Sequence, residues 1–331
     1  MNSAVALSPG VPVVGVEVPS LRVAPLRLAT PLLVSLALSA IVLLALLAAT
    51  GMRLGPEFAR FSLLAAMMGC LAGYCHYRRY HWQMTDSALV VAFAIASLML
   101  CGLVSSVALR LGLPLVDAAL ARADALIGFD TRPMVHFVAA NTWLSGLLYL
   151  AYGSSALLCL AAFGWSMLKR DRVQMWRIVA TIGVAMQITA LASILFPARG
   201  AALSLGLDAL QGHGLPGGAG TYFADAFAYF YSGRDTLVAL DRMNGIVSFP
   251  SYHTVMALVI VQGFAATILR WPAILWSALI IVSTVPMGGH YVVDLAAGLF
   301  VWVVALLLAQ WASRAPAASA SGERPAGFDP L

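Results

Sequence analysis

The sequence predicts an all-α membrane protein, a polytopic bundle of about eight transmembrane helices with a six-helix core. Three observations predict this fold. Of the 331 residues, 61% are apolar and only 10% are charged, whereas about a quarter of the residues of a soluble domain carry charge. The mean hydropathy is +0.90. Apolar runs recur along the whole chain, and many approach the roughly 20 residues that one crossing needs.

The apolar runs give the order and the limits of the predicted membrane helices. The second and the seventh are short. The predicted helices lie near residues 30–50, 61–75, 88–109, 138–166, 178–196, 253–269, 272–286 and 290–312.

One helix is expected to lie along the membrane surface rather than across it. The stretch 113–127 is too polar to span, and its charged residues Asp117, Arg122 and Asp124 are typical of an interfacial helix. Outside the bundle, residues 1–28 and 315–331 are rich in Pro, Ala, Ser and Gly, which predicts a disordered cytoplasmic N-terminus and a disordered cytoplasmic tail. Nothing in residues 1–28 has the pattern of a cleaved signal peptide.

The basic residues of the short connections predict the orientation. Cytoplasmic loops carry an excess of Lys and Arg. Eight helices that start from a cytoplasmic N-terminus place eleven of the nineteen cationic residues on the cytoplasmic side. These include the pair Arg78–Arg79 and the cluster of Lys169, Arg170, Arg172 and Arg177.

Composition also limits the partners. The net charge is +5, but the basic residues flank apolar runs and form no stripe, so no nucleic acid is expected as a partner. The four cysteines lie within apolar runs, and no Cys-x-x-Cys or Cys/His ligand spacing occurs. We therefore expect no metal, no cofactor and no disulfide framework.

Three polar islands interrupt the apolar second half of the chain. They are residues 196–200 (FPARG), 248–253 (SFPSYH) and 288–294 (GGHYVVD). The topology derived from the loop charges places all three at the same membrane face. This agreement predicts one site, built from all three islands, at the non-cytoplasmic surface.

His290 and Asp294 are the strongest pair in these islands. On a helix, residues four apart share one face, so the carboxylate can hold one imidazole nitrogen and leave the other free as a nucleophile. An ionisable pair at a membrane boundary is costly unless it faces a polar cavity. The alternative is a buried hydrogen bond that only joins two helices.

The second island resembles a helix start. Pro250 restricts the chain, Ser251 is a good capping residue, and free N–H groups at a helix N-terminus attract phosphate oxygens. His253 could then protonate a leaving oxygen. In the first island, Arg199 could clamp phosphate oxygens. The alternatives are an ordinary cap, an interfacial histidine and a snorkelling arginine.

Pro-Ser-x-His followed 37 residues later by His-x-x-x-Asp, each opening an apolar helix, resembles the type 2 phosphatidic acid phosphatase superfamily over roughly residues 190–310. The resemblance implies that His290 forms a phosphohistidine, that Asp294 supports it and that His253 protonates the leaving group. It also implies that Ser251 and nearby backbone, with Gly289 and Arg199 as further candidates, hold the phosphate. The family needs no metal. By this resemblance we divide the chain into accessory helices (29–110) and a catalytic membrane domain (111–314).

Two departures from the commonest family pattern point to one branch. The usual first motif of Lys, six residues, then Arg-Pro has only Arg132-Pro133 as a candidate, and Ala125 stands at the Lys position. Ser283-Thr284 replaces the usual Ser-Arg before the third motif. Ser-Thr here is more similar to the branch that contains inositol phosphorylceramide synthase.

The expected function is phosphoryl transfer from a lipid phosphate or a phospholipid headgroup. The branch slightly favours a headgroup phosphotransferase with a polyol or lipid alcohol as acceptor, and a lipid phosphate phosphatase is the alternative. A non-catalytic lipid transporter or scramblase is the alternative of another class. The abundance of Ala, Leu and Arg over Lys is typical of a bacterial inner membrane protein, and the orientation predicts an active site that faces the periplasm.

Overall fold

The computed structural model describes residues 25–233, 235–243 and 246–314, and it confirms a polytopic helical bundle. Seven described helices are long and apolar enough to cross a membrane, and α10 is a shorter apolar helix. These eight helices are α1 (Pro25–Thr50), α2 (Glu57–Tyr77), α3 (Trp82–Leu109), α6 (Thr142–Leu168), α7 (Arg172–Leu195), α10 (Tyr252–Phe264), α11 (Arg270–Gly288) and α12 (Val292–Ser313).

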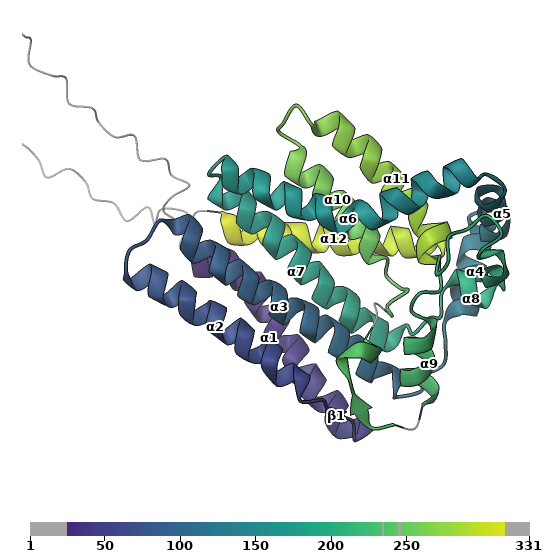
Figure 1. Cartoon of the computed structure of the whole chain (residues 1–331), viewed down its shortest axis with the longest axis horizontal. Helices are drawn as coiled ribbons and strands as arrows, with labels where there is room; N and C mark the ends of the chain where they lie inside the picture. Colours follow the sequence, from purple (N-terminus) through teal and green to yellow (C-terminus); the bar gives the residue numbers. More distant parts are fainter. Residues whose placement is uncertain (1–24, 234, 244–245, 315–331) are drawn as a thin grey trace, which may run out of the picture.

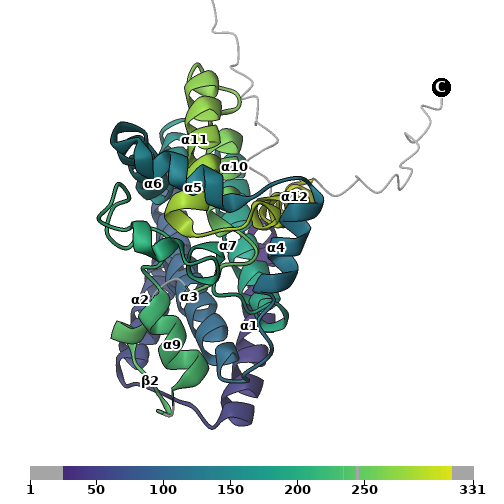
Figure 2. The same cartoon turned by 90° about the vertical axis from the view of Figure 1, so that its right-hand side faces the viewer.

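The two ends of the bundle differ in character. The connections after α1, α3, α7 and α11 meet at one end, which we call the site end, and Figure 2 looks onto it. The connections after α2, α6 and α10 lie at the opposite end (Figure 1). The short elements α4 (Asp117–Leu126), α5 (Thr131–Ala140), α8 (Ala201–Ser204), α9 (Ala224–Ser232), β1 (Arg53–Leu54) and β2 (Leu237–Val238), with 3₁₀ turns at Leu207–Leu210 and Leu240–Arg242, belong to the site end.

Several helices begin or end at residues other than those predicted. The helix predicted for 253–269 ends at Phe264, and residues 265–269 form turns before α11. The predicted helix 138–166 is divided at Asn141, whose Nδ2 donates a hydrogen bond of 2.6 Å to the carbonyl of Phe137. Such a local side-chain bond competes with the helical ladder. α2 and α11 are longer than predicted, and α4 occupies the stretch predicted as interfacial.

The predicted disordered termini fall largely outside the described residues. Of the N-terminal stretch 1–28, only the last four residues are described, and they are helical because α1 begins at Pro25. Proline suits a helix start, since its missing N–H would have no helical partner there. The tail 315–331 lies outside the described residues.

α7 is the central helix of the bundle. Its buried residues, such as Trp176, Ile178 and Val184, lie on all sides of the helix, as in a helix covered by its neighbours. Ile178, Val184 and Ala185 of α7 pack in the largest buried cluster with residues of α6, α10, α11 and α12. Near the opposite end, Arg172 donates two hydrogen bonds, of 2.6 and 2.9 Å, to buried Asp86 of α3, which also accepts one from Trp176. These bonds attach α3 to the central helix.

The long connection between α7 and α10 is attached to the N-terminal helices. β2 pairs in parallel with β1, which follows α1. The carboxylate of Glu57 accepts the N–H of Leu240 at 2.9 Å. Arg110, at the end of α3, donates to the carbonyls of Tyr229, Gly233 and Asp235. The connection is therefore held over the site end by α1, α2 and α3.

Candidate active site

The N-terminus of α12 holds the pair that the sequence singled out. Nδ1 of His290 lies 3.2 Å from Oδ2 of Asp294, and both side chains are buried, with exposures of 4% and 0%. A carboxylate can only accept, so the proton of this bond belongs to Nδ1, and Nε2 of His290 keeps its lone pair. The arrangement leaves an oriented imidazole with one free nitrogen.

The geometry behind this contact differs from the prediction. His290 was expected on the helix itself, but α12 begins at Val292 and Tyr291 is its N-cap residue. Oδ2 of Asp294 reaches back to the N–H of Tyr291 at 2.9 Å, as the third residue of a capped helix does. The same carboxylate oxygen thereby approaches His290. The pair is brought together by a helix cap rather than by a helix face.

α4 fixes the two polar loops of the site with two carboxylates. Asp124 accepts the N–H groups of Val292 and Val293, each at 2.9 Å. Asp117 accepts the N–H groups of Arg199 and Gly200, each at 2.9 Å. Both aspartates are buried. They stand two helical turns apart, on one face of the surface helix, and they hold the first and third islands against each other.

Glycines allow close backbone contact between the loops. Gly289 has a φ of +70°, in the left-handed region, and a Cβ there would lie 2.6 Å from the carbonyl oxygen of Gly220. A Cβ on Gly200, whose φ is +83°, would lie 2.7 Å from the carbonyl oxygen of Gly289. Backbone bonds join the same segments, because Ala201 donates to Gly289 and Gly220 donates to Met287. The backbone conformation and these close contacts thus explain a glycine at position 289 without any role in phosphate binding.

The start of α10 has the predicted cap. The Oγ of Ser251 accepts the N–H of Thr254 at 3.5 Å, and the N–H of Ser251 donates to the carbonyl of Asp294 at 3.0 Å. Gly298 of α12 lies under this turn, where a Cβ would meet the carbonyl oxygen of Ser251 at 2.4 Å. The Oγ of Ser251 acts here only as an acceptor, and its predicted contact with phosphate stays a prediction.

His253 lies against an aromatic side chain. Its ring stacks on Tyr152 of α6 with a centroid separation of 4.0 Å. The hydroxyl of Tyr152 lies 3.3 Å from that of Tyr222 in the long connection. Burial raises the pKa of the Tyr222 hydroxyl above its ordinary value, so this group stays protonated near neutral pH. The stack fixes the direction in which the imidazole points.

One cavity of about 460 Å³ reaches both histidines. His253, His290 and Tyr222 supply polar groups to its wall. Apolar side chains from α2, α3, α7 and the long connection form most of the rest: Phe58, Phe61, Ile95, Leu98, Met99, Met186, Met243 and Ile246. A polar spot with two imidazoles at the wall of an apolar cavity suits a ligand with a polar head and a hydrocarbon body.

Arg199 is not brought into this cavity. Its backbone N–H donates to Asp117, which places it beside the third island, but its side chain is exposed and does not line the cavity. No Lys or Arg lines the cavity among the residues that the structure describes. The role of Arg199 as a phosphate clamp stays a prediction.

The structure adds residues that the sequence did not single out for the site. Asp117 and Asp124 were interpreted only as signs of a surface helix. Their spacing of seven residues puts both on one helical face, a signal that could have suggested a common partner. Tyr152 and Tyr222 stand in an apolar helix and in a glycine-rich loop, and no spacing pattern marks them.

Comparison with known proteins identifies the family of this fold. A family model described as the PAP2 superfamily matches residues 118–308, more than half of the chain. The matched segment contains Asp124, His253, His290 and Asp294 and leaves α1, α2 and α3 outside. No curated protein and no solved structure matches the chain.

Proposed function

The chain belongs to the PAP2 superfamily, and on that premise we propose an integral-membrane enzyme that transfers a phosphoryl group from a lipid phosphate or a phospholipid headgroup through a phosphohistidine at His290. Membership supports a phosphatase or phosphotransferase of lipid phosphates at a coarse level. The observation that carries the finer proposal is the placement of His290, paired with Asp294, and of His253 on one cavity.

The proposed first step forms a bond between Nε2 of His290 and phosphorus, while the bond from phosphorus to the departing oxygen breaks. His253, protonated, gives its proton to that oxygen as a general acid. His290 carries positive charge once it is phosphorylated. Asp294 stabilises that charge through Nδ1, at the 3.2 Å contact. The products of this step are a free alcohol and the phosphoenzyme.

The proposed second step reverses these roles. Neutral His253 removes a proton from water or from an acceptor alcohol, whose oxygen attacks phosphorus as the phosphorus–nitrogen bond breaks. Water gives a phosphatase, and an alcohol gives a headgroup phosphotransferase similar to inositol phosphorylceramide synthase. The Ser283-Thr284 pair slightly favours transfer. The burial of His290 under the long connection is consistent with limited access of water.

A lipid substrate is supported by the walls of the cavity. α2 and α3, which we propose as accessory helices within residues 29–110, supply about half of its apolar side chains, such as Phe58, Phe61 and Leu98. Burial of hydrocarbon is favourable by about 0.8 kcal/mol for each CH₂ group. We infer that the accessory helices bind the hydrocarbon part of the substrate, next to the catalytic domain proposed for residues 111–314.

For the phosphate itself we propose Arg199 as the cation, with Ser251 and the backbone near Gly289 as further ligands. Arg199 belongs to the loop whose backbone Asp117 holds beside Gly289. Its exposed side chain would have to turn inward when substrate binds. The enzyme is proposed to need no metal and no cofactor, since both reaction steps use only the two histidines and Asp294.

We propose a bacterial inner membrane as the location, with the site facing the periplasm. The orientation is supported by the distribution of charge, because Arg78, Arg79, Lys169 and Arg170 lie in the connections at the opposite end, and the bacterial membrane by the abundance of Ala, Leu and Arg over Lys. Positive loops favour the cytoplasmic side.

The proposal is tested with purified protein and a lipid phosphate labelled on phosphorus. Release of labelled phosphate in water, or labelled product when myo-inositol, glycerol or a lipid alcohol is added, separates hydrolysis from transfer. The His290→Ala variant must lose both activities. Equal turnover by both proteins would contradict the catalytic proposal and favour a non-catalytic lipid transporter or scramblase, which a lipid-flipping assay in vesicles would then detect.

A further inference from the structure

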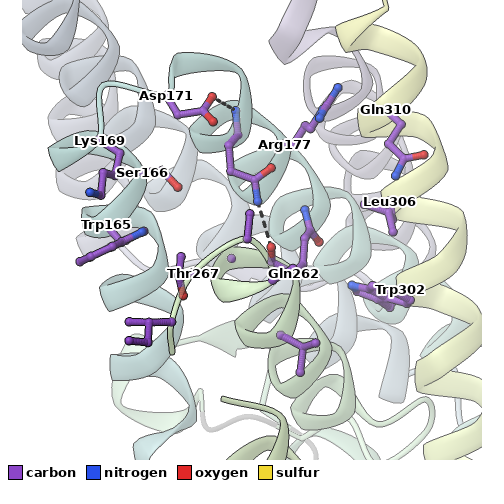
Figure 3. A pocket seen from close by; sticks show the side chains of 16 residues that line it. Trp165, Ser166, Lys169, Asp171, Arg177, Gln262, Thr267, Trp302, Leu306 and Gln310 are labelled. Carbon is purple, nitrogen blue, oxygen red and sulfur yellow. Dashed lines mark hydrogen bonds between the residues drawn. The ribbon is translucent and has the colours of Figure 1, made fainter. Parts of the chain in front are cut away.

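A second cavity, of about 840 Å³, lies at the opposite end of the bundle from the histidines. The end of α6, the start of α7, the turns between α10 and α11, and the last part of α12 form its walls (Figure 3). It shares no lining residue with the cavity of His253 and His290. The proposed reaction makes no use of it.

The cavity has more positive than negative charge. Lys169 and Arg177 line it, and Asp171 is the single carboxylate among its lining residues. Asp171 caps α7 by accepting the N–H of Gln174 at 2.9 Å. Neither Lys169 nor Arg177 forms an ion pair with a described carboxylate. Two cations without such a partner leave the cavity suited to an anion.

The two cations are held by neutral neighbours. Nζ of Lys169 lies 5.0 Å from the ring centroid of Trp165, a cation–π contact. Nε of Arg177 donates to the Oγ of Ser313 at 2.8 Å, which leaves the two terminal nitrogens of the guanidinium as further donors. These contacts place the charges without neutralising them.

The remaining wall combines amides with apolar surface. Nε2 of Gln174 donates to the backbone carbonyl of Gln262 at 3.0 Å, and Gln310 of α12 also lines the cavity. Trp302 and Leu306 of α12 and Ile268 add apolar surface. A soluble anion would gain nothing from this apolar wall, whereas the glycerol backbone and first acyl carbons of a phospholipid would.

We propose that this cavity binds the headgroup of an anionic phospholipid from the membrane leaflet at that end. The phosphate lies against Lys169 and Arg177, and the acyl chains leave along Trp302 and Leu306. Basic pockets between membrane helices are known to hold anionic headgroups. A lipid bound there would join α6, α7 and α12, which carry the site at their other ends. The inference does not depend on the proposed reaction.

The test uses the full-length protein in a neutral detergent with phosphatidylglycerol, phosphatidylcholine or inorganic phosphate as the probe. Native mass spectrometry counts retained lipid, and thermal unfolding measures stabilisation. Phosphatidylglycerol is expected to bind and to raise the Tm, and the other two are not. The double variant Lys169→Gln/Arg177→Gln should bind it roughly 30-fold more weakly, at about fivefold for each basic residue.

Arg78→Gln/Arg79→Gln is the matched control, because it removes two charges at the same end outside the cavity. It should keep phosphatidylglycerol binding. The single variant Arg177→Lys, which keeps the charge, should bind phosphatidylglycerol more tightly than Lys169→Gln/Arg177→Gln. This comparison distinguishes lost charge from lost folding. Equal weakening by both double variants, or equal binding of phosphatidylcholine or inorganic phosphate, would overturn the proposal. None of these results depends on turnover, so the proposed reaction could fail while this site holds.

Discussion

Nδ1 of His290 lies 3.2 Å from Oδ2 of Asp294, while Oδ1 of the same carboxylate is buried without a hydrogen-bond partner among the described residues. Burying a polar atom without a hydrogen-bond partner costs of the order of 1–3 kcal/mol, and more for a charged group such as a carboxylate. A group kept at that cost, beside an imidazole on a cavity wall, is expected to serve a function beyond joining two segments.

Asp294→Asn tests this pair with little change of shape. The amide oxygen can still accept the N–H of Tyr291 and Nδ1–H of His290, but the negative charge that stabilises phosphorylated His290 is lost. We expect kcat to fall roughly 10²- to 10⁴-fold while the protein still folds. Steady-state kinetics and thermal unfolding, measured together, check this. Unchanged kcat would mean that Asp294 only caps α12.

His253→Gln tests the proposed general acid through the leaving group. A lipid alkoxide leaves poorly without a proton, so we expect a loss of roughly 10²- to 10⁴-fold with a lipid phosphate. A p-nitrophenyl phosphate ester has a good leaving group and should lose far less in its first step. The burst of p-nitrophenol released in the first turnover is the measurement, because later turnovers also need His253 as the base of the second step. Equal losses with both substrates would assign His253 a role other than protonation.

Asp124→Ala tests the contribution of α4. The change leaves the N–H groups of Val292 and Val293 without their acceptor, and we expect a loss of about 1–3 kcal/mol in the free energy of unfolding. Activity should fall as well, since His290 stands next to this turn. Arg122→Ala is the control, because Arg122 is an exposed residue of the same helix. Equal stability of the two variants would contradict the role of Asp124.

The sequence predicted the helical bundle and the three islands because both depend on local patterns. Length and apolar composition mark membrane helices, and Ser251 as a cap depends on near neighbours. The contacts of Asp117 and Asp124 could not be predicted, since each joins residues 82 to 174 positions apart. The cavity could not be predicted for the same reason, because α2 and α3 look like ordinary spans. They contribute to the site only because α2 packs on α3 and α3 packs on α7.

Gly102→Leu tests whether the cavity holds hydrocarbon. Gly102 lines the cavity, and a Cβ there would meet Cε of Met243, the flexible end of a side chain, at 2.4 Å. A leucine side chain should therefore displace the end of the Met243 side chain and fill part of the cavity. We expect KM to rise for long-chain lipid phosphates and to change little for short-chain ones. Gly146→Ala, with open space around its Cβ, is the control. An equal effect on both chain lengths would exclude the hydrocarbon role.

The central claim is that His290 becomes covalently phosphorylated. The direct measurement is to mix the protein with a lipid phosphate labelled on phosphorus, quench within one turnover and count label bound to protein. The account predicts a phosphoenzyme that is labile in acid and stable in base, and that is absent from His290→Ala. A catalytically active protein that forms no such adduct, or an adduct that persists in His290→Ala, would contradict it.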